Sequence, residues 1–129
     1  MDRARLRFAL LPGEFAVCRL DPAAPVPPWA GAGPFSSITR TADELSVVCP
    51  EPSVPGGVQA ARGWRCLKLE GPFDFSVTGL VAAFSTALAR AGISLMVLCT
   101  YDTDYLLVRG PDLDRAIASL ERDGFRIRR

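Results

Sequence analysis

Two carboxylates stand between two apolar runs in the stretch ISLMVLCTYDTDYLLV, which covers residues 93–108 of the 129-residue chain. Asp102 and Asp104 could attack a substrate as a nucleophile, hold a metal ion, close a tight turn or bind the cationic part of a ligand. Each of these roles predicts different residues elsewhere in the chain, so the remaining sequence has to decide between them.

The nucleophile role requires catalytic partners that this sequence lacks. A strand ending in Asp-x-Asp is similar to the motif of haloacid-dehalogenase-type phosphatases, but that fold needs a crossover helix after the motif, and Tyr105 begins another apolar run instead. The one lysine, Lys68, precedes the motif, and the chain contains no histidine, the commonest general base. No nucleophile elbow or phosphate-binding loop is visible. We therefore expect that the protein is not an enzyme.

A metal role finds no better support. Calcium needs roughly six to eight oxygen ligands, and no EF-hand spacing is present. The four cysteines lie far apart in apolar runs with no CxxC pair: Cys18, Cys49, Cys66 and Cys99. We expect them to be reduced core cysteines of a cytoplasmic protein, although the sequence leaves disulfides open. No metal or other cofactor is expected.

Composition limits the class of partner. The chain is 49% apolar and 22% charged, which predicts a folded domain with a core. A net charge of +1 gives no electrostatic case for nucleic acid or an anionic membrane. No apolar run approaches the roughly 20 residues of a membrane span, and the start does not resemble a secretory signal.

The second half of the chain shows the clearer pattern of elements. Strands are predicted at 64–70, 93–100, 105–109 and 125–128, and helices at 78–91 and from Pro111 to Gly124. The first helix carries an apolar stripe at i, i+4, i+7 and i+8 and is followed by Gly92, a helix stop signal. The order β-α-β-β-α-β is that of the ferredoxin-like split βαβ motif.

The first half has short strand-like runs separated by segments rich in Pro and Gly. Strands are predicted at 6–11, 15–20, 35–39 and 45–49, with a loop at 21–33 and a linker at 50–63 that includes a helical turn at 58–62. Residues 35–48 also echo residues 95–108, because both place an acid, Glu44 or Asp104, just before an apolar strand. We therefore predict an α+β protein of two tandem ferredoxin-like units, at residues 1–62 and 63–129.

A second feature favours the ligand role for the acidic hairpin. The segment from Glu70 to Gly79 runs directly into the predicted helix at 78–91. The first turn of a helix has unpaired N–H groups and a partial positive charge, which suit a carboxylate, and Gly79 allows a ligand to approach the backbone. An anion-binding helix start and an acidic hairpin together match a zwitterion. Ordinary capping by Ser76 or Thr78 and an ordinary turn at Gly71-Pro72 remain open as alternatives.

Five segments in order resemble a family of small bacterial ACT-domain proteins related to the CASTOR arginine sensors. They are FAVCRL at 15–20, TADELSVVC at 41–49, WRCLKLEG at 64–71, DFSVTG at 74–79 and CTYDTDYLLV at 99–108. The resemblance implies the ACT fold, which has the β-α-β-β-α-β order, and a regulatory role in which amino acids bind at an interface between ACT units.

The resemblance also implies site residues, motif by motif. The strand at 44–48 implies Ser46 and Val47, and the helix junction implies the backbone of Gly79 and Leu80 with Thr78 beside them. The hairpin implies Asp104 with Thr100, Tyr101 and Thr103. Val77 stands where CASTOR has an acidic residue, so the resemblance does not carry arginine over as the ligand.

We therefore predict a non-catalytic sensor that binds a free amino acid between the two halves of the chain. The helix start is expected to take the α-carboxylate and Asp104 the ammonium or a cationic side chain, while Ser46 and Val47 close the site. The protein is expected to self-associate as a homodimer and to act on a regulated partner protein. The alternative is a module without a ligand that only mediates assembly.

Overall fold

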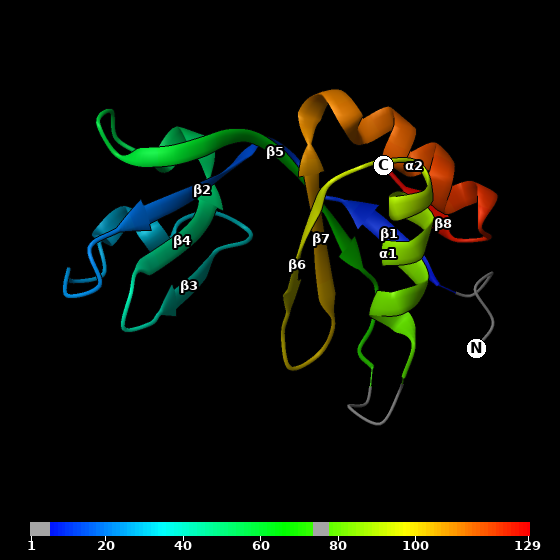
Figure 1. Ribbon diagram of the computed structural model, residues 1–129, viewed down its shortest axis with the longest axis horizontal. Coiled ribbons are helices and arrows are strands. Elements are labelled where there is room, and N and C mark those ends of the chain that lie inside the picture. Colours follow the sequence, from blue (N-terminus) through cyan, green and yellow to red (C-terminus); the bar gives the residue numbers. More distant parts are fainter. Residues whose placement is uncertain (1–5, 74–77) are drawn as a thin grey trace. The chain divides into compact units, whose positions relative to one another are not determined.

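The computed structural model describes residues 6–73 and 78–129 (Figure 1). The strands are β1 (Arg7–Leu10), β2 (Phe15–Leu20), β3 (Ser37–Arg40), β4 (Leu45–Pro50), β5 (Gln59–Leu69), β6 (Leu95–Cys99), β7 (Asp104–Arg109) and β8 (Arg126–Arg128). The α-helices are α1 (Leu80–Arg90) and α2 (Leu113–Arg122), and short 3₁₀-helices are η2 (Pro28–Gly31), η3 (Glu51–Ser53) and η4 (Gly110–Asp112). The chain is of the α+β class, as predicted.

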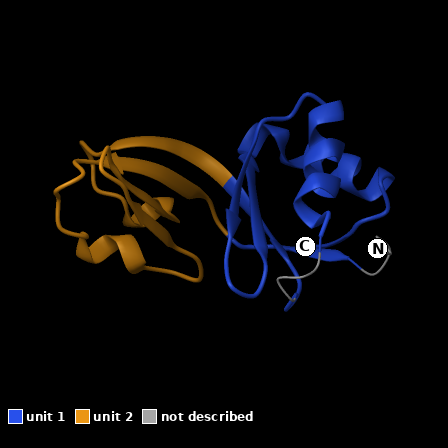
Figure 2. Ribbon diagram, turned by 60° about the horizontal axis from the view of Figure 1, so that its bottom comes forward, with its two compact units in different colours: residues 1–12, 65–129 blue, residues 13–64 orange. Residues whose placement is uncertain are grey.

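The chain divides into two compact units (Figure 2). Unit 1 comprises residues 1–12 and 65–129, of which 6–12, 65–73 and 78–129 are described, and unit 2 comprises residues 13–64. The boundary between Trp64 and Arg65 lies near the one predicted after residue 62. The prediction placed the first strand in the N-terminal half, whereas β1 belongs to unit 1.

The first strand joins unit 1 because its side chains complete the core there. β1 pairs antiparallel with β5 and parallel with β8. Phe8 of β1 is completely buried and meets the ring of Phe84 of α1 edge-on, with 5.6 Å between the ring centroids. Edge-to-face packing of this kind adds about 1 kcal/mol beyond the burial of apolar area. A short apolar run read alone does not reveal such a distant partner.

Unit 1 has the ferredoxin-like arrangement with one added strand. The strand order is β6-β7-β5-β1-β8, so β1 lies between the first and last strands of the β5-α1-β6-β7-α2-β8 sequence. Figure 1 shows α1 and α2 next to the strands of this unit, and buried side chains of both helices share one apolar cluster with strand residues such as Leu67 and Leu106. This cluster holds the start of α1 and the β6–β7 hairpin in fixed positions.

Unit 2 keeps the strand order of the motif without its α-helices. β2, β3, β4 and β5 follow one another along the chain and lie in the order β3-β4-β2-β5. The pairs β2–β4, β3–β4 and β2–β5 are all antiparallel. Where the motif has helices, the described residues of this unit contain only η2 and η3. Its core is a smaller cluster around Leu45, Val47 and Cys49.

The helical turn predicted at 58–62 is wrong, because Gln59 begins the long strand β5. Helix propensity of an Ala-Ala-Arg segment is a weak local preference that tertiary pairing overrides. Cys18 and Arg19 of β2 lie opposite Ala60 and Gln59 of β5 in the sheet of unit 2. The remaining predicted elements differ from the observed ones by a few residues at their ends, as at α1, which begins at Leu80 rather than at residue 78.

Candidate functional site

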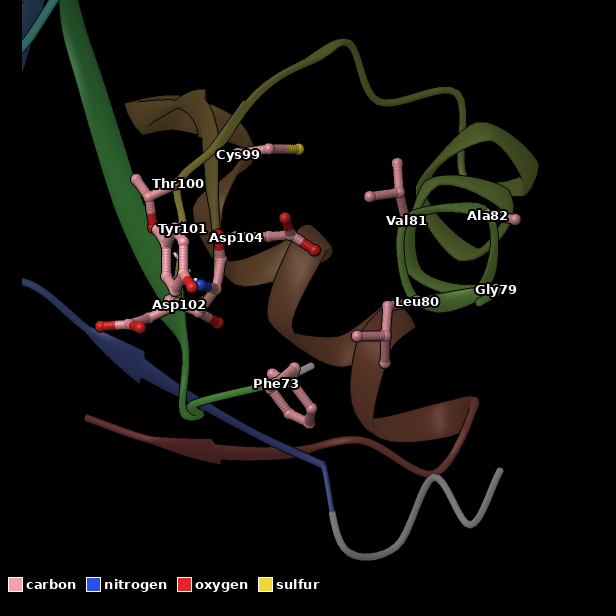
Figure 3. A pocket seen from close by; sticks show the side chains of 11 residues that line it. Phe73, Gly79, Leu80, Val81, Ala82, Cys99, Thr100, Tyr101, Asp102 and Asp104 are labelled. Atoms are coloured by element: carbon pink, nitrogen blue, oxygen red, sulfur yellow. Dashed lines mark hydrogen bonds between the residues drawn. The ribbon is translucent and has the colours of Figure 1, made fainter. Parts of the chain in front are cut away.

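A pocket of about 280 Å³ lies in unit 1 between the start of α1 and the β6–β7 hairpin (Figure 3). One wall is formed by the first turn of α1 and the opposite wall by the hairpin. The described lining residues are Phe73, Gly79, Leu80, Val81, Ala82, Cys99, Thr100, Tyr101, Asp102, Thr103 and Asp104. The two sequence features that predicted a ligand, the helix start and the acidic hairpin, therefore meet at one cavity.

The helix wall begins at a glycine in the left-handed region. Gly79 is the N-cap of α1 with φ of 83°, and its carbonyl accepts a 2.9 Å hydrogen bond from the N–H of Ala83. Glycine has no side chain that could accept a hydrogen bond from the first turn, and that turn carries no acidic residue. A helix start of this kind presents N–H donors and a partial positive charge to an incoming anion.

The hairpin wall is held by a turn between Thr100 and Thr103. The N–H of Thr100 donates to the carbonyl of Thr103 at 2.8 Å, and the hydroxyl of Thr100 donates to the same carbonyl at 3.1 Å. The buried hydroxyl of Thr103 donates to the carbonyl of Leu69 in β5 at 2.5 Å. These bonds tie the hairpin tip to the sheet, so Asp104 leaves the turn in a defined direction.

The two hairpin carboxylates point in different directions. Figure 3 shows the carboxylate of Asp104 directed from β7 toward Leu80 and Val81, and that of Asp102 directed away from α1. Asp102 also lines a smaller pocket of about 160 Å³, beside Lys68. Its backbone carbonyl accepts a 2.8 Å hydrogen bond from the N–H of Phe73. Asp104 is therefore the acid that faces the larger pocket, and Asp102 has a role in the turn.

Cys99 stands opposite Asp104 in the β6–β7 ladder. Partial desolvation and then the neighbouring carboxylate of Asp104 raise the pKa of Cys99 to about 11. The thiol is nevertheless exposed, unlike Cys18, Cys49 and Cys66. The prediction of a core position was therefore wrong for Cys99, because the residue lies at the end of an edge strand, where its side chain faces the pocket rather than the apolar cluster.

Six of the predicted site residues line this pocket, namely Gly79, Leu80, Thr100, Tyr101, Thr103 and Asp104. Thr78 directly precedes them and is exposed, but it is not among the lining residues. The site residues predicted from the sequence did not include Phe73, Val81, Ala82 and Cys99, which also line the pocket. Val81 could have been found, because it falls outside the apolar stripe that faces the core.

Ser46 and Val47 belong to β4 of unit 2. The side chain of Val47 is completely buried in the core of that unit. Ser46 lines a separate pocket of about 320 Å³ in unit 2, together with Arg19 and Glu44. Contact of Ser46 and Val47 with a ligand stays a prediction.

Two negative findings apply to residues 6–73 and 78–129. Within these ranges, no group of three or more His, Cys, Asp or Glu side chains could hold a metal ion. In the same part of the chain, no helix is both long and apolar enough to cross a membrane.

Comparisons with known proteins agree with this fold. Residues 59–122 match the ACT-domain family model, and residues 13–57 match a model described as an N-terminal domain. The solved structure of Atu0741 from Agobacterium tumefaciens is 40% identical in sequence and has a TM-score of 0.90. The match covers 95% of this chain and 92% of that chain. No curated protein matches the chain.

More distant structures share the fold alone. VC0802 from Vibrio cholerae, described as a possible transport protein, is 22% identical, with a TM-score of 0.76 over 94% of this chain and 91% of that one. The ligand-free regulatory subunit of aspartate kinase from Thermus thermophilus is 10% identical, with a TM-score of 0.61 over 90% of this chain and 96% of that one. The chain therefore belongs to the same family as Atu0741 and carries an ACT domain at residues 59–122.

Proposed function

We propose that the pocket of unit 1 binds a free amino acid without catalysis and that binding gives the protein a regulatory role. The observation that carries the proposal is the direction of Asp104, whose carboxylate faces the first turn of α1 across the cavity. Asp104 forms no ion pair with any residue that the structure describes. A carboxylate placed in this way has room for an external cation.

The two walls are complementary to the two ends of an amino acid. The α-carboxylate would accept hydrogen bonds from the N–H groups of Leu80 and Val81, and the ammonium would lie against Asp104. Burying either charge without a partner costs several kcal/mol, so a site for a zwitterion has to meet both ends. The ACT domain at residues 59–122 and the resemblance of the hairpin to the CASTOR segment that ends in a ligand-binding aspartate support this orientation.

Both walls are also connected to the core of unit 1, which favours a preformed site. The hairpin is tied to β5 through the Thr103 hydroxyl, and the helix is held by the buried side chains of Phe84 and Leu88. A preformed site avoids much of the entropy that ordering a loop around the ligand would cost.

A thermal-shift screen against the twenty amino acids, followed by isothermal titration, tests the proposal. A ligand present at one hundred times its dissociation constant stabilises the folded state by about 2.7 kcal/mol. Asp104→Asn should abolish the binding of a ligand found in this way while leaving the unfolding transition nearly unchanged. Asp102→Asn is the matched control, since its carboxylate is directed away from α1, and it should retain binding.

The opposite results would contradict the proposal. If no amino acid stabilises the protein, the assembly module without a ligand becomes the better account. If a ligand binds equally well to wild type and to Asp104→Asn, the site lies elsewhere. Ser46→Ala tests in the same titration whether unit 2 contributes, as the sequence predicted.

A further inference from the structure

We infer that the amino acid bound in this pocket has an uncharged, apolar side chain. The inference rests on the proposed function and adds the class of ligand, which neither the ACT match nor the similar structures supply. It follows from the number of charged side chains that face the cavity and from the apolar side chains that line it.

The described lining residues include two acids and no base. Of the two acids, Asp102 is directed away from α1 and also lines the smaller pocket beside Lys68. Among the described lining residues, one carboxylate, that of Asp104, therefore faces the cavity. The proposed function assigns the α-carboxylate to the N–H groups in the first turn of α1, and a helix start carries only a partial positive charge.

The ammonium and the α-carboxylate of a bound amino acid would occupy the Asp104 carboxylate and the N–H groups at the start of α1. A lysine or arginine ligand would bring a second cation, and among the described lining residues no second carboxylate is directed at it. A glutamate or aspartate ligand would bring a second carboxylate where no lysine or arginine lines the described walls. An extra charge without a partner in a site partly shielded from water is penalised, which favours a ligand whose side chain is neutral.

Much of the remaining wall surface is apolar. Phe73, Leu80 and Val81 turn their side chains toward the cavity, and Val81 remains 38% exposed although it is large and apolar. The hydroxyl protons of Thr100 and Thr103 are already donated to carbonyls of the protein. A side chain of the size of valine, leucine or methionine would cover Val81 and Phe73 and gain the free energy of burying apolar area.

Titration with matched ligand pairs tests this inference separately from the proposed function. Norleucine and lysine have the same carbon chain and differ in one ammonium, and glutamine and glutamate differ in one charge. We expect norleucine, leucine or methionine to bind at least tenfold more tightly than lysine, arginine, glutamate and aspartate. Tighter binding of a charged amino acid that depends on Asp104 would overturn the inference and leave the proposed function standing. Failure of every amino acid to bind would contradict both this inference and the proposed function.

A substitution in the pocket provides an independent test. Val81 is partly exposed in the first turn of α1, where an acid is compatible with the helix, so Val81→Glu should fold. This variant would supply the missing second carboxylate and is expected to reverse the preference, with lysine binding more tightly than norleucine. Val81→Gln has nearly the same size without the charge and should not favour lysine. An unchanged preference in Val81→Glu would show that Val81 does not face the ligand side chain.

Discussion

Cys99 and Asp104 are partners across the β6–β7 ladder, and the carboxylate of Asp104 contributes to the raised pKa of the Cys99 thiol. This pairing joins the one exposed cysteine of the described chain to the acid that faces the pocket. The raised pKa of Cys99 means that the thiol stays protonated near neutral pH and does not compete with Asp104 as a second negative charge. The pairing therefore makes Cys99 a reporter of the charge in the pocket.

Removing the charge of Asp104 should make Cys99 more reactive. Desolvation and then Asp104 raise the pKa of Cys99 to about 11, so Asp104→Asn should lower that pKa and increase the thiolate fraction at any pH below it. We expect alkylation of the folded protein by iodoacetamide at pH 8 to be several times faster in Asp104→Asn than in wild type. Mass spectrometry after proteolysis would locate the label, since Cys18, Cys49 and Cys66 are buried.

Asp102→Asn serves as the control for this measurement. Its carboxylate is directed away from α1 and is not among the groups that shift the pKa of Cys99, so the rate should stay near that of wild type. Equal rates in wild type and Asp104→Asn would mean that Asp104 does not control the pKa of Cys99.

Replacing Gly79 should damage the pocket more than the fold. Its φ of 83° is costly for any residue with a Cβ, by about 1–2 kcal/mol. Gly79→Ala should therefore lower the free energy of unfolding by about that amount in urea denaturation. Because Gly79 begins the helix turn that lines the pocket, the strain should also weaken ligand binding in isothermal titration.

Gly92→Ala is the matched control for Gly79→Ala. Gly92 follows the other end of α1, has φ of 70° and would meet no atom within 4 Å of an added Cβ. It should lose a similar amount of stability and keep its affinity for the ligand. If both variants lose affinity equally, general destabilisation rather than the geometry of the helix start is responsible.

The hydroxyl of Thr103 should matter for stability out of proportion to its size. It donates to the carbonyl of Leu69 from a position that is 7% exposed. Thr103→Val removes the donor and leaves a buried carbonyl without it, which should cost about 1–3 kcal/mol in urea denaturation. Thr103→Ser retains the hydroxyl and should lose less. A larger loss in the serine variant would show that methyl packing, not the hydrogen bond, holds the hairpin.

Alkaline pH should destabilise the protein through its buried thiols. Burial raises the pKa of Cys66 to about 12, whereas a cysteine in an unfolded chain ionises near pH 8.5. Between these values the unfolded state has lost a proton that the folded state keeps, so the free energy of unfolding falls as pH rises. Below about pH 8.5 this contribution is fully present, and above it the slope approaches about 1.4 kcal/mol per pH unit for one such group.

Urea denaturation under reducing conditions from pH 7 to pH 10.5 would measure this slope. Cys66→Ala should be less stable at pH 7, because it leaves a small cavity, but its stability should fall less steeply above pH 8.5. Parallel curves for wild type and Cys66→Ala would contradict the assignment of the slope to Cys66.

Local sequence patterns predicted many of the helices and strands of unit 1. The stripe that includes Leu80, Phe84 and Leu88 predicted α1, because a period of 3.6 residues places those side chains on one face. Apolar runs on both sides of the acidic turn predicted the β6–β7 hairpin. These elements are determined by neighbours in the chain, so their prediction needs no knowledge of the rest of the fold.

Pairing between strands determined the direction of Asp104, the position of β1 and the extent of β5. The local pattern placed Asp102 and Asp104 in one hairpin without distinguishing them, and only the resemblance to the CASTOR segment singled out Asp104 as the acid that faces a ligand. That difference arises because the turn from Thr100 to Thr103 sets where β7 begins, and the Cys99–Asp104 register then directs one carboxylate toward α1. In the same way, β1 joined unit 1, and residues 59–62 became part of β5, since hydrogen bonds between strands and burial against a remote core outweigh local propensity.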